Sequence, residues 1–237
     1  MSHQRMVYVI DHDLETRRFL SLHLASLGAE AWPFASGAEF LEISAHLMPA
    51  CLVLDMDMPA GGLELMTELA RRGIVWPVIA TSAGREVGPA VEAMKQGAVD
   101  FLQKPLDRAV LAGALAPAWS ALDRMIETQE SRRRAQERMG RLTAREVDIS
   151  LALLSGQPNK TVAHVFGISV RTVEMHRAHI MAKLGVRSLA EAAVIATQAG
   201  LELAPAVLSR RAADYAPPLP RHAALAQPAF RFSRSAV

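Results

Sequence analysis

The chain has 237 residues, which is enough for two ordinary domains and a connector. Its single cysteine, Cys51, excludes an intramolecular disulfide and a cysteine-based zinc site. The formal net charge of +2 conceals an asymmetry, because residues 1–115 carry 14 Asp and Glu against 9 Lys and Arg, whereas residues 116–204 carry 9 against 12. An acidic first half and a basic second half favour one regulatory module and one module that binds a polyanion.

The apolar segments of the chain are short. The first residues lead directly into a strand-like run, MVYVI, without the apolar core and cleavage site of a signal peptide. No apolar run approaches the roughly 18 residues that a membrane-spanning helix needs. We therefore expect a cytoplasmic protein with no membrane partner.

Short apolar runs alternate with amphipathic segments over residues 1–116. The expected strands are 6–10, 30–34, 50–54, 77–80 and 99–102. The expected helices lie near 14–26, 37–46, 62–72, 87–96 and 107–116. This alternation predicts an α/β fold with a doubly wound, five-stranded parallel sheet. The functional crevice of such a sheet lies at the carboxyl ends of its strands.

Chemically active side chains follow the expected strands at that edge. They are Asp11, His12, Asp13, Asp55, Thr81 and Lys104. Neighbouring carboxylates can hold Mg²⁺, and a carboxylate can attack a phosphoryl group to form an acyl phosphate. A threonine hydroxyl and a lysine ammonium can then hydrogen-bond the phosphoryl oxygens. The alternative is that acidic residues only cap the following helices, which accounts for Asp13 better than for Asp55.

This half of the chain resembles the receiver domain of two-component response regulators. The resemblance runs through VYVIDHD, LVLDMDMP, GLELM, VIATS and AVEAMKQGAVDFLQKP. It implies that Asp55 is the phosphoacceptor and that Mg²⁺ is held by Asp11, Asp55 and the backbone carbonyl of Asp57. The residues that it implies as the phosphate switch are Thr81, Phe101 and Lys104. It also implies a cis peptide bond between Lys104 and Pro105.

One position departs from the receiver pattern. Receivers normally carry two adjacent acids after the first strand, and here the pair is Asp11 and His12. An imidazole is a poor ligand for Mg²⁺, which prefers oxygen, and an imidazolium would repel the ion. Asp13 could substitute only if the loop rearranged. We therefore expect weakened Mg²⁺ binding and inefficient phosphorylation of Asp55, or a pseudo-receiver that is controlled by dimerisation or a protein partner.

A remote alternative for the same motif is an enzyme. Asp55-Met56-Asp57 also resembles the nucleophile motif of haloacid-dehalogenase-type phosphatases, in which the second Asp is a general acid. Those enzymes usually place the motif on the first strand, whereas here it follows the third strand and precedes Met58-Pro59. We therefore expect a protein that is not an enzyme.

Residues 117–140 are expected to form a helical linker. Pro117 should start or bend a helix there. A short coiled-coil seam, with spacings of four, three and four residues, is formed by Leu115, Trp119, Leu122 and Ile126. This seam could dimerise two protomers, dock the two domains, or pack onto the preceding domain.

Residues 141–204 contain a helix that is suited to insertion into a groove. Ser169 can cap its start, Gly185 can end it, and an apolar stripe supplies a side to bury. A short helix and a glycine-containing turn precede it, which is the geometry of a helix-turn-helix. An ordinary helical hairpin with a solvated charged face is the alternative. Thr143 with Glu146 forms a capping box that starts the first helix of this region.

This region resembles the LuxR-type helix-turn-helix domain, an all-α module of four helices. The matching segments are LTAREVDISLALLSG, NKTVAHVFGIS, RTVEMHRAHIMAKLG and SLAEAAVIA. With the first half, the chain resembles the FixJ/NarL class of response regulators. That resemblance implies double-stranded DNA as a partner, a sensor histidine kinase as the source of the signal, and contact with RNA polymerase. Since one such module is small, we expect a homodimer on two half-sites.

The second helix of the motif supplies most of the expected DNA contacts. Side chains expected at base edges are Arg171, Glu174, Met175 and Ala178. Those expected at phosphates are Lys160, Thr161, Thr172, Arg177 and Lys183. Residues 205–237 are rich in Ala, Pro and Arg, and we expect them to form a disordered basic tail.

Overall fold

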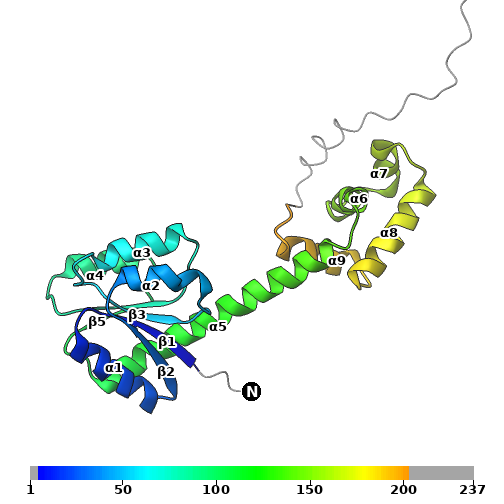
Figure 1. Cartoon of the computed structure of the whole chain (residues 1–237). Coiled ribbons are helices and arrows are strands. Elements are labelled where there is room, and N and C mark those ends of the chain that lie inside the picture. Colours follow the sequence, from blue (N-terminus) through cyan, green and yellow to red (C-terminus); the bar gives the residue numbers. More distant parts are fainter. Residues whose placement is uncertain (1–4, 203–237) are drawn as a thin grey trace, which may run out of the picture. The chain divides into compact units, whose positions relative to one another are not determined.

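The computed structural model describes residues 5–202 (Figure 1). The chain divides into two compact units between Glu130 and Ser131. The expected tail over 205–237 lies outside the described residues. Within the described part, no helix is long and apolar enough to span a membrane.

The first unit is built on the predicted five-stranded parallel sheet, with strand order β2-β1-β3-β4-β5. The strands are β1 (Arg5–Ile10), β2 (Ala29–Phe34), β3 (Cys51–Asp55), β4 (Val78–Ser82) and β5 (Asp100–Gln103). The helices are α1 (Leu14–Ser26), α2 (Gly37–Ile43), α3 (Gly62–Arg71), α4 (Val87–Lys95) and α5 (Arg108–Met139). The helix expected over 37–46 is divided into α2 and a 3-10 turn, η1 (Ser44–His46).

Helices cover both faces of this sheet (Figure 1). Tyr8 and Ile10 of β1 pack in one apolar core with residues of α2, α3 and α4, whereas Val7 and Val9 pack in a second core with residues of α1 and α5. Cys51 lies in the second core, and burial raises the pKa of its thiol to about 12. Because β1 and β3 are buried on both sides, the residues that end them are fixed in position.

Helix α5 differs from the predicted linker. It begins at Arg108 and continues to Met139 with Pro117 inside it, so Pro117 does not start a helix, and the alternative that it bends one stays a prediction. Leu115 and Ala118 lie before and after the proline and are fully buried in the core beside α1. This burial offsets the cost of an internal proline, which is about 3 kcal/mol. The residues of the expected seam pack onto this same core, which agrees with the alternative that the seam packs onto the preceding domain. They are Leu115, Trp119, Leu122 and Ile126.

The second unit is all-α, as predicted. Its helices are α6 (Ala144–Leu154), α7 (Asn159–Phe166), α8 (Val170–Leu184) and α9 (Leu189–Gln198). They enclose one apolar core to which Ala135 and Met139, at the end of α5, also contribute. The capping box of Thr143 and Glu146 is present at the start of α6.

Candidate functional site

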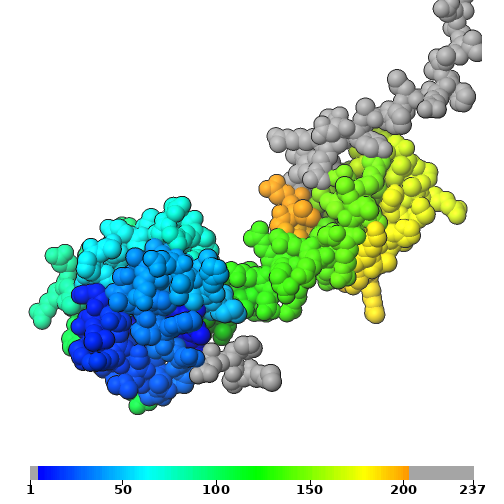
Figure 2. All heavy atoms as spheres, in the orientation of Figure 1, coloured from blue at the N-terminus to red at the C-terminus, as the bar shows by residue number. Residues whose placement is uncertain are grey.

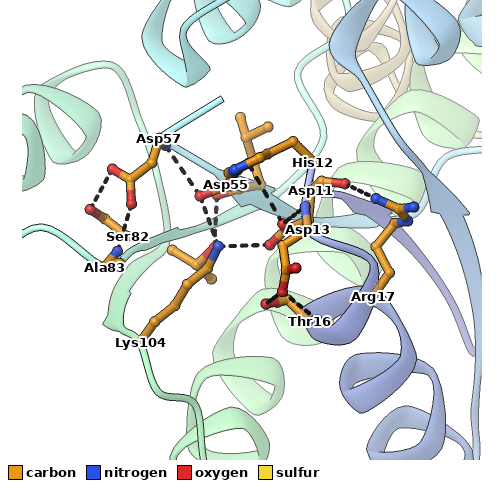
Figure 3. Close-up of polar contacts among 12 residues, drawn as sticks. Asp11, His12, Asp13, Thr16, Arg17, Asp55, Asp57, Ser82, Ala83 and Lys104 are labelled. Atoms are coloured by element: carbon orange, nitrogen blue, oxygen red, sulfur yellow. Dashed lines mark hydrogen bonds and ion pairs between the residues drawn. The ribbon is translucent and has the colours of Figure 1, made fainter. Parts of the chain in front are cut away.

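Two buried carboxylates and one lysine meet at the carboxyl edge of the sheet (Figure 3). Asp11 directly follows β1 and Asp55 ends β3, and both are buried. Lys104 follows β5, and its Nζ lies 2.9 Å from Asp11 Oδ2 and 2.9 Å from Asp55 Oδ1. The predicted convergence of these three residues is therefore present.

Burial and ion pairing have opposite effects on the pKa values of this cluster. Burial raises the pKa of Asp11 above its ordinary value, and the hydrogen bond with Lys104 only partly opposes this. Burial would lower the pKa of Lys104, but the two carboxylates outweigh it and the pKa is raised. Lys104 therefore keeps its positive charge between the two carboxylates.

His12 reaches the same cluster from the loop after β1. Its Nδ1 lies 2.6 Å from Asp55 Oδ2 and 4.0 Å from Asp11 Oδ1. Asp55 Oδ1 also accepts a hydrogen bond of 3.2 Å from the backbone N–H of Asp57. Both oxygens of Asp55 are thus engaged, one by Lys104 and the Asp57 N–H, the other by the imidazole of His12.

The other residues expected at this edge lie close by. Thr81, near the end of β4, is buried, and its hydroxyl donates a 3.3 Å hydrogen bond to the carbonyl of Leu54. Phe101 is half-buried and packs against the core beside α4. The bond between Lys104 and Pro105 is cis, as expected.

Helix α8 carries the second candidate site. Val173, Ile180 and Leu184 are buried in the core of its unit. Ser169 accepts a hydrogen bond from the backbone N–H of Thr172, and Gly185 ends the helix with φ of 63°. The rest of α8 lies at the surface of this unit (Figure 2). Its exposed side chains include Arg171, Glu174, Met175, Arg177, Ala178 and Lys183.

Comparisons with known proteins match both units. Residues 7–116 match the response regulator receiver domain, and residues 140–196 match the bacterial regulatory proteins of the luxR family. The transcriptional regulatory protein FixJ of Azorhizobium caulinodans is 39% identical over 196 residues, which cover 82% of this chain and 93% of that protein. FixJ of Rhizobium meliloti is 34% identical over 184 residues, which cover 77% and 90% of the two chains.

Solved structures match over similar lengths. The response regulator StyR is 32% identical, with a TM-score of 0.72 over 83% of this chain and 100% of that one. Full-length FixJ from B. japonicum is also 32% identical, with a TM-score of 0.52 over 84% and 98% of the two chains. The chain belongs to the FixJ/NarL class of two-component response regulators. It is a DNA-binding transcription regulator with a receiver domain and a LuxR-type domain.

The receiver donor set does not fit Mg²⁺ well. The groups that converge are the carboxylates of Asp11 and Asp55 and the imidazole of His12, whose ligand atoms lie within 4.8 Å of one another. Mg²⁺ favours oxygen ligands in near-ideal octahedral geometry, and the imidazole supplies nitrogen instead. Asp13 does not replace the missing acid in this structure. Its carboxylate caps α1 by accepting hydrogen bonds from the backbone N–H and the hydroxyl of Thr16, and these lower its pKa.

Sequence reasoning missed the role of the Asp57 side chain. Its carboxylate accepts hydrogen bonds from Ser82 Oγ at 2.7 Å and from the backbone N–H of Ala83 at 2.6 Å (Figure 3). Burial opposes ionisation, but these hydrogen bonds lower the pKa of Asp57. The loop after β3 is therefore joined to the loop after β4. The resemblance had assigned only the backbone carbonyl of Asp57, and the sequence held no signal for this contact.

Two contacts of α6 with the other helices of the LuxR-type domain were also not predicted from the sequence. Lys183 Nζ lies 2.6 Å from Glu146 Oε2, so its ammonium is engaged within the domain. This pairing and the capping-box contacts with Thr143 lower the pKa of Glu146 to about 2. Arg145 donates a 2.7 Å hydrogen bond to the carbonyl of Phe166, the last residue of α7. Arg145 thus holds the end of α7, while Glu146 joins the start of α6 to the last turn of α8.

Proposed function

We propose that the receiver controls DNA binding through Asp55 as phosphoacceptor, and that His12 weakens Mg²⁺-dependent phosphorylation of this residue. The observation that carries the proposal is the 2.6 Å separation of His12 Nδ1 and Asp55 Oδ2. A carboxylate that attacks phosphorus needs a free oxygen and nearby positive charge. Lys104 supplies positive charge, while His12 covers the oxygen that Lys104 leaves open.

The side chain of His12 is 47% exposed, whereas Asp55 is fully buried. The imidazole can therefore turn out toward solvent without opening the core. Phosphorylation would have to compete with the contact between His12 and Asp55, and it would lack the second acidic ligand for Mg²⁺. Both effects slow the reaction, and neither abolishes it.

The test is modification by acetyl phosphate or binding of beryllofluoride over a range of Mg²⁺ concentrations. We expect slow modification of the wild type, faster Mg²⁺-dependent modification of His12→Asp, and none of Asp55→Ala. His23→Ala is a matched control, because His23 lies on α1 and its Nδ1 is bonded to the carbonyl of Phe19. Rapid modification of the wild type at low Mg²⁺ would overturn the proposal.

The second candidate is a pseudo-receiver that regulates DNA binding through dimerisation or a protein partner. The engagement of both Asp55 oxygens favours it. This candidate predicts that Asp55→Asn has the same DNA binding and oligomeric state as the wild type. The first candidate predicts that beryllofluoride changes DNA binding and oligomeric state in the wild type and changes neither in Asp55→Asn. The phosphatase alternative would need the Asp57 carboxyl as a general acid. The structure does not favour this, because that carboxylate accepts hydrogen bonds from Ser82 and Ala83.

For the output we propose that α8 enters the DNA major groove. In this proposal Arg171, Glu174, Met175 and Ala178 face base edges. The proposed phosphate contacts are Lys160, Thr161, Thr172, Arg177 and Lys183. Lys183 would have to share its ammonium with Glu146, so its contribution should be the smallest. Gel-shift titrations at several salt concentrations test this arrangement.

The proposed organisation is a receiver over 1–116, a helical linker over 117–140, a LuxR-type domain over 141–204 and a basic tail over 205–237. A cytoplasmic homodimer on two half-sites, signalled by a histidine kinase and in contact with RNA polymerase, fits the class. Sizing of the chain with and without operator DNA tests the dimer. A monomer that binds a single half-site with full affinity would contradict it.

A further inference from the structure

The side chains of Asp11, His12 and Asp55 meet in the arrangement of a metal site that has both oxygen and nitrogen donors. Asp11 follows β1 and Asp55 ends the neighbouring parallel strand β3, since Ile10 of β1 pairs with Leu54 of β3. The two carboxylates are 1% and 0% exposed, and the imidazole closes the group from the solvent side. One ligand atom from each residue lies within 4.8 Å of the other two.

Each carboxylate divides its oxygens between two neighbours (Figure 3). Asp11 Oδ2 and Asp55 Oδ1 each lie 2.9 Å from Lys104 Nζ, so these two oxygens are occupied by the ammonium. Asp11 Oδ1 and Asp55 Oδ2 are the oxygens nearer His12 Nδ1, at 4.0 and 2.6 Å. Two oxygens and one nitrogen are therefore directed to one place, apart from the lysine.

Backbone groups hold the two carboxylates in this orientation. The N–H of Asp13 donates a 2.8 Å hydrogen bond to Asp11 Oδ1, and the N–H of Asp57 donates to Asp55 Oδ1. Such outer contacts orient metal ligands and raise affinity. The fold thus orients the two carboxylates, and an ion would take the place of the 2.6 Å contact between His12 Nδ1 and Asp55 Oδ2.

The charge also suits a divalent ion. Two carboxylates and one lysine leave one net negative charge, and a neutral imidazole adds none. Two carboxylates and one imidazole, with an open position for water, are a donor set that Zn²⁺ accepts. Mg²⁺, by contrast, retains its waters and takes oxygen ligands.

We propose that Asp11, His12 and Asp55 bind a nitrogen-accepting divalent ion of the Zn²⁺ type, so that the receiver has exchanged its metal preference. This inference rests on the proposed weakening of the Mg²⁺ site. In this inference His12 is itself a metal ligand, and its nitrogen changes the preferred ion from Mg²⁺ to Zn²⁺. The proposed function requires only that Mg²⁺ binds weakly.

The test is calorimetric titration of the full chain with Zn²⁺ alone and with Mg²⁺ alone. The variants are His12→Ala, which removes the nitrogen, and His12→Asp, which supplies the usual acid. Because His12 is half exposed, both should fold, and circular dichroism checks this. The other histidines are common to all these chains, so their binding of Zn²⁺ cancels in the comparison. His23→Ala is the matched control.

We expect His12→Ala to weaken one stoichiometric Zn²⁺ site by at least ~10- to 100-fold, because loss of an outer contact alone has an effect of that size and His12 is proposed as a direct ligand. His12→Asp should strengthen Mg²⁺ binding and lower the ratio of Zn²⁺ to Mg²⁺ affinity. Equal Zn²⁺ affinity in the wild type and His12→Ala, or an unchanged ratio in His12→Asp, would overturn the inference.

The outcomes separate this inference from the proposed function. Slow modification of Asp55 together with Zn²⁺ binding that does not depend on His12 refutes the Zn²⁺ site and leaves the proposed function standing. Rapid modification of the wild type at low Mg²⁺ refutes the proposed function, whatever Zn²⁺ does. Failure of the Zn²⁺ site and failure of the proposed function therefore give different results.

Discussion

Arg138, in the last turn of α5, donates a 2.8 Å hydrogen bond from Nε to the carbonyl of Leu184, the last residue of α8. Its Nη2 also donates to that carbonyl and lies 3.3 Å from the carbonyl of Gly185. A guanidinium at the C-terminus of a helix satisfies free carbonyls and opposes the helix dipole. The end of α5 thereby holds the end of α8.

Arg138→Ala should therefore loosen the C-terminal turn of α8. We expect faster hydrogen exchange of the α8 amides, equivalent to a loss of about 1 kcal/mol in local stability. Mass spectrometry of the exchanged chain measures this, and Arg138→Lys should recover part of the protection. Arg133→Ala is the control, because Arg133, on the same helix, pairs with Glu137 and both side chains are exposed. Equal exchange in the wild type and Arg138→Ala would contradict the prediction.

The pairing of Glu146 makes the stability of the LuxR-type domain depend on pH. The pKa of Glu146 is lowered in the fold to about 2 from the ordinary 4.5. A lowered carboxyl pKa stabilises the fold above the ordinary value, and this contribution is lost as pH falls from 4.5 toward 2. We expect Glu146→Gln to be less stable than the wild type by about 1 kcal/mol at neutral pH, which is the upper range for a partly exposed ion pair.

Urea unfolding followed by circular dichroism at a series of pH values measures this difference. It should shrink as pH falls toward 2, because the wild-type carboxyl becomes neutral like the amide. Lys183→Gln should move the loss to higher pH, since Lys183 is the main cause of the lowered pKa. A difference that stays constant across this pH range would show that the ion pair contributes nothing.

The carboxylate of Asp57 should stabilise the loop after β4. Asp57→Ala leaves the N–H of Ala83 and the hydroxyl of Ser82 without their acceptor, which should cost about 1–2 kcal/mol. The chain has three tryptophans, Trp32, Trp76 and Trp119, and all precede the division between the units. Tryptophan fluorescence during urea unfolding therefore reports on the first unit.

Ser82→Ala removes only one of the two donors to Asp57, so its loss of stability should be smaller. Exchange of the Ala83 amide should rise in Asp57→Ala and stay near the wild-type rate in Ser82→Ala. If the two variants lose equal stability, the backbone contact to Ala83 does not matter and the expected ranking is wrong.

The sequence predicted the features that depend on periodicity and on strand ends. Asp11, Asp55 and Lys104 meet because the carboxyl ends of parallel strands lie at one edge, which needs no side-chain detail. The contact between His12 and Asp55 depends on the rotamer of one loop residue, and the contact of Asp57 with Ser82 depends on how two loops approach. Neither leaves a pattern in the sequence.

At Pro117 the sequence does carry a strong local signal, but packing overrides it. A proline favours a helix start or a break, yet α5 continues through it. Burial of Leu115 and Ala118 on the receiver core outweighs the local preference. Asp13 shows a similar competition between two roles. It caps the start of α1 and does not take the position of the substitute Mg²⁺ ligand.

Arg171 provides the sharpest test of the output. It is exposed in the first turn of α8, where side chains of a recognition helix reach base edges. Arg171→Ala should weaken binding to operator DNA by about 1–3 kcal/mol and leave binding to random DNA nearly unchanged.

Lys160→Ala is the matched comparison, because Lys160 is an exposed cation on α7 rather than on the recognition helix. As a phosphate contact it should weaken binding to operator and random DNA alike, and reduce the slope of log affinity against log salt by about 1. Gel-shift titrations of both variants on both DNAs at three salt concentrations measure these effects. If Arg171→Ala weakens both DNAs equally and also reduces the slope, Arg171 contacts a phosphate, and the base-reading face of α8 must be reassigned to Glu174, Met175 and Ala178.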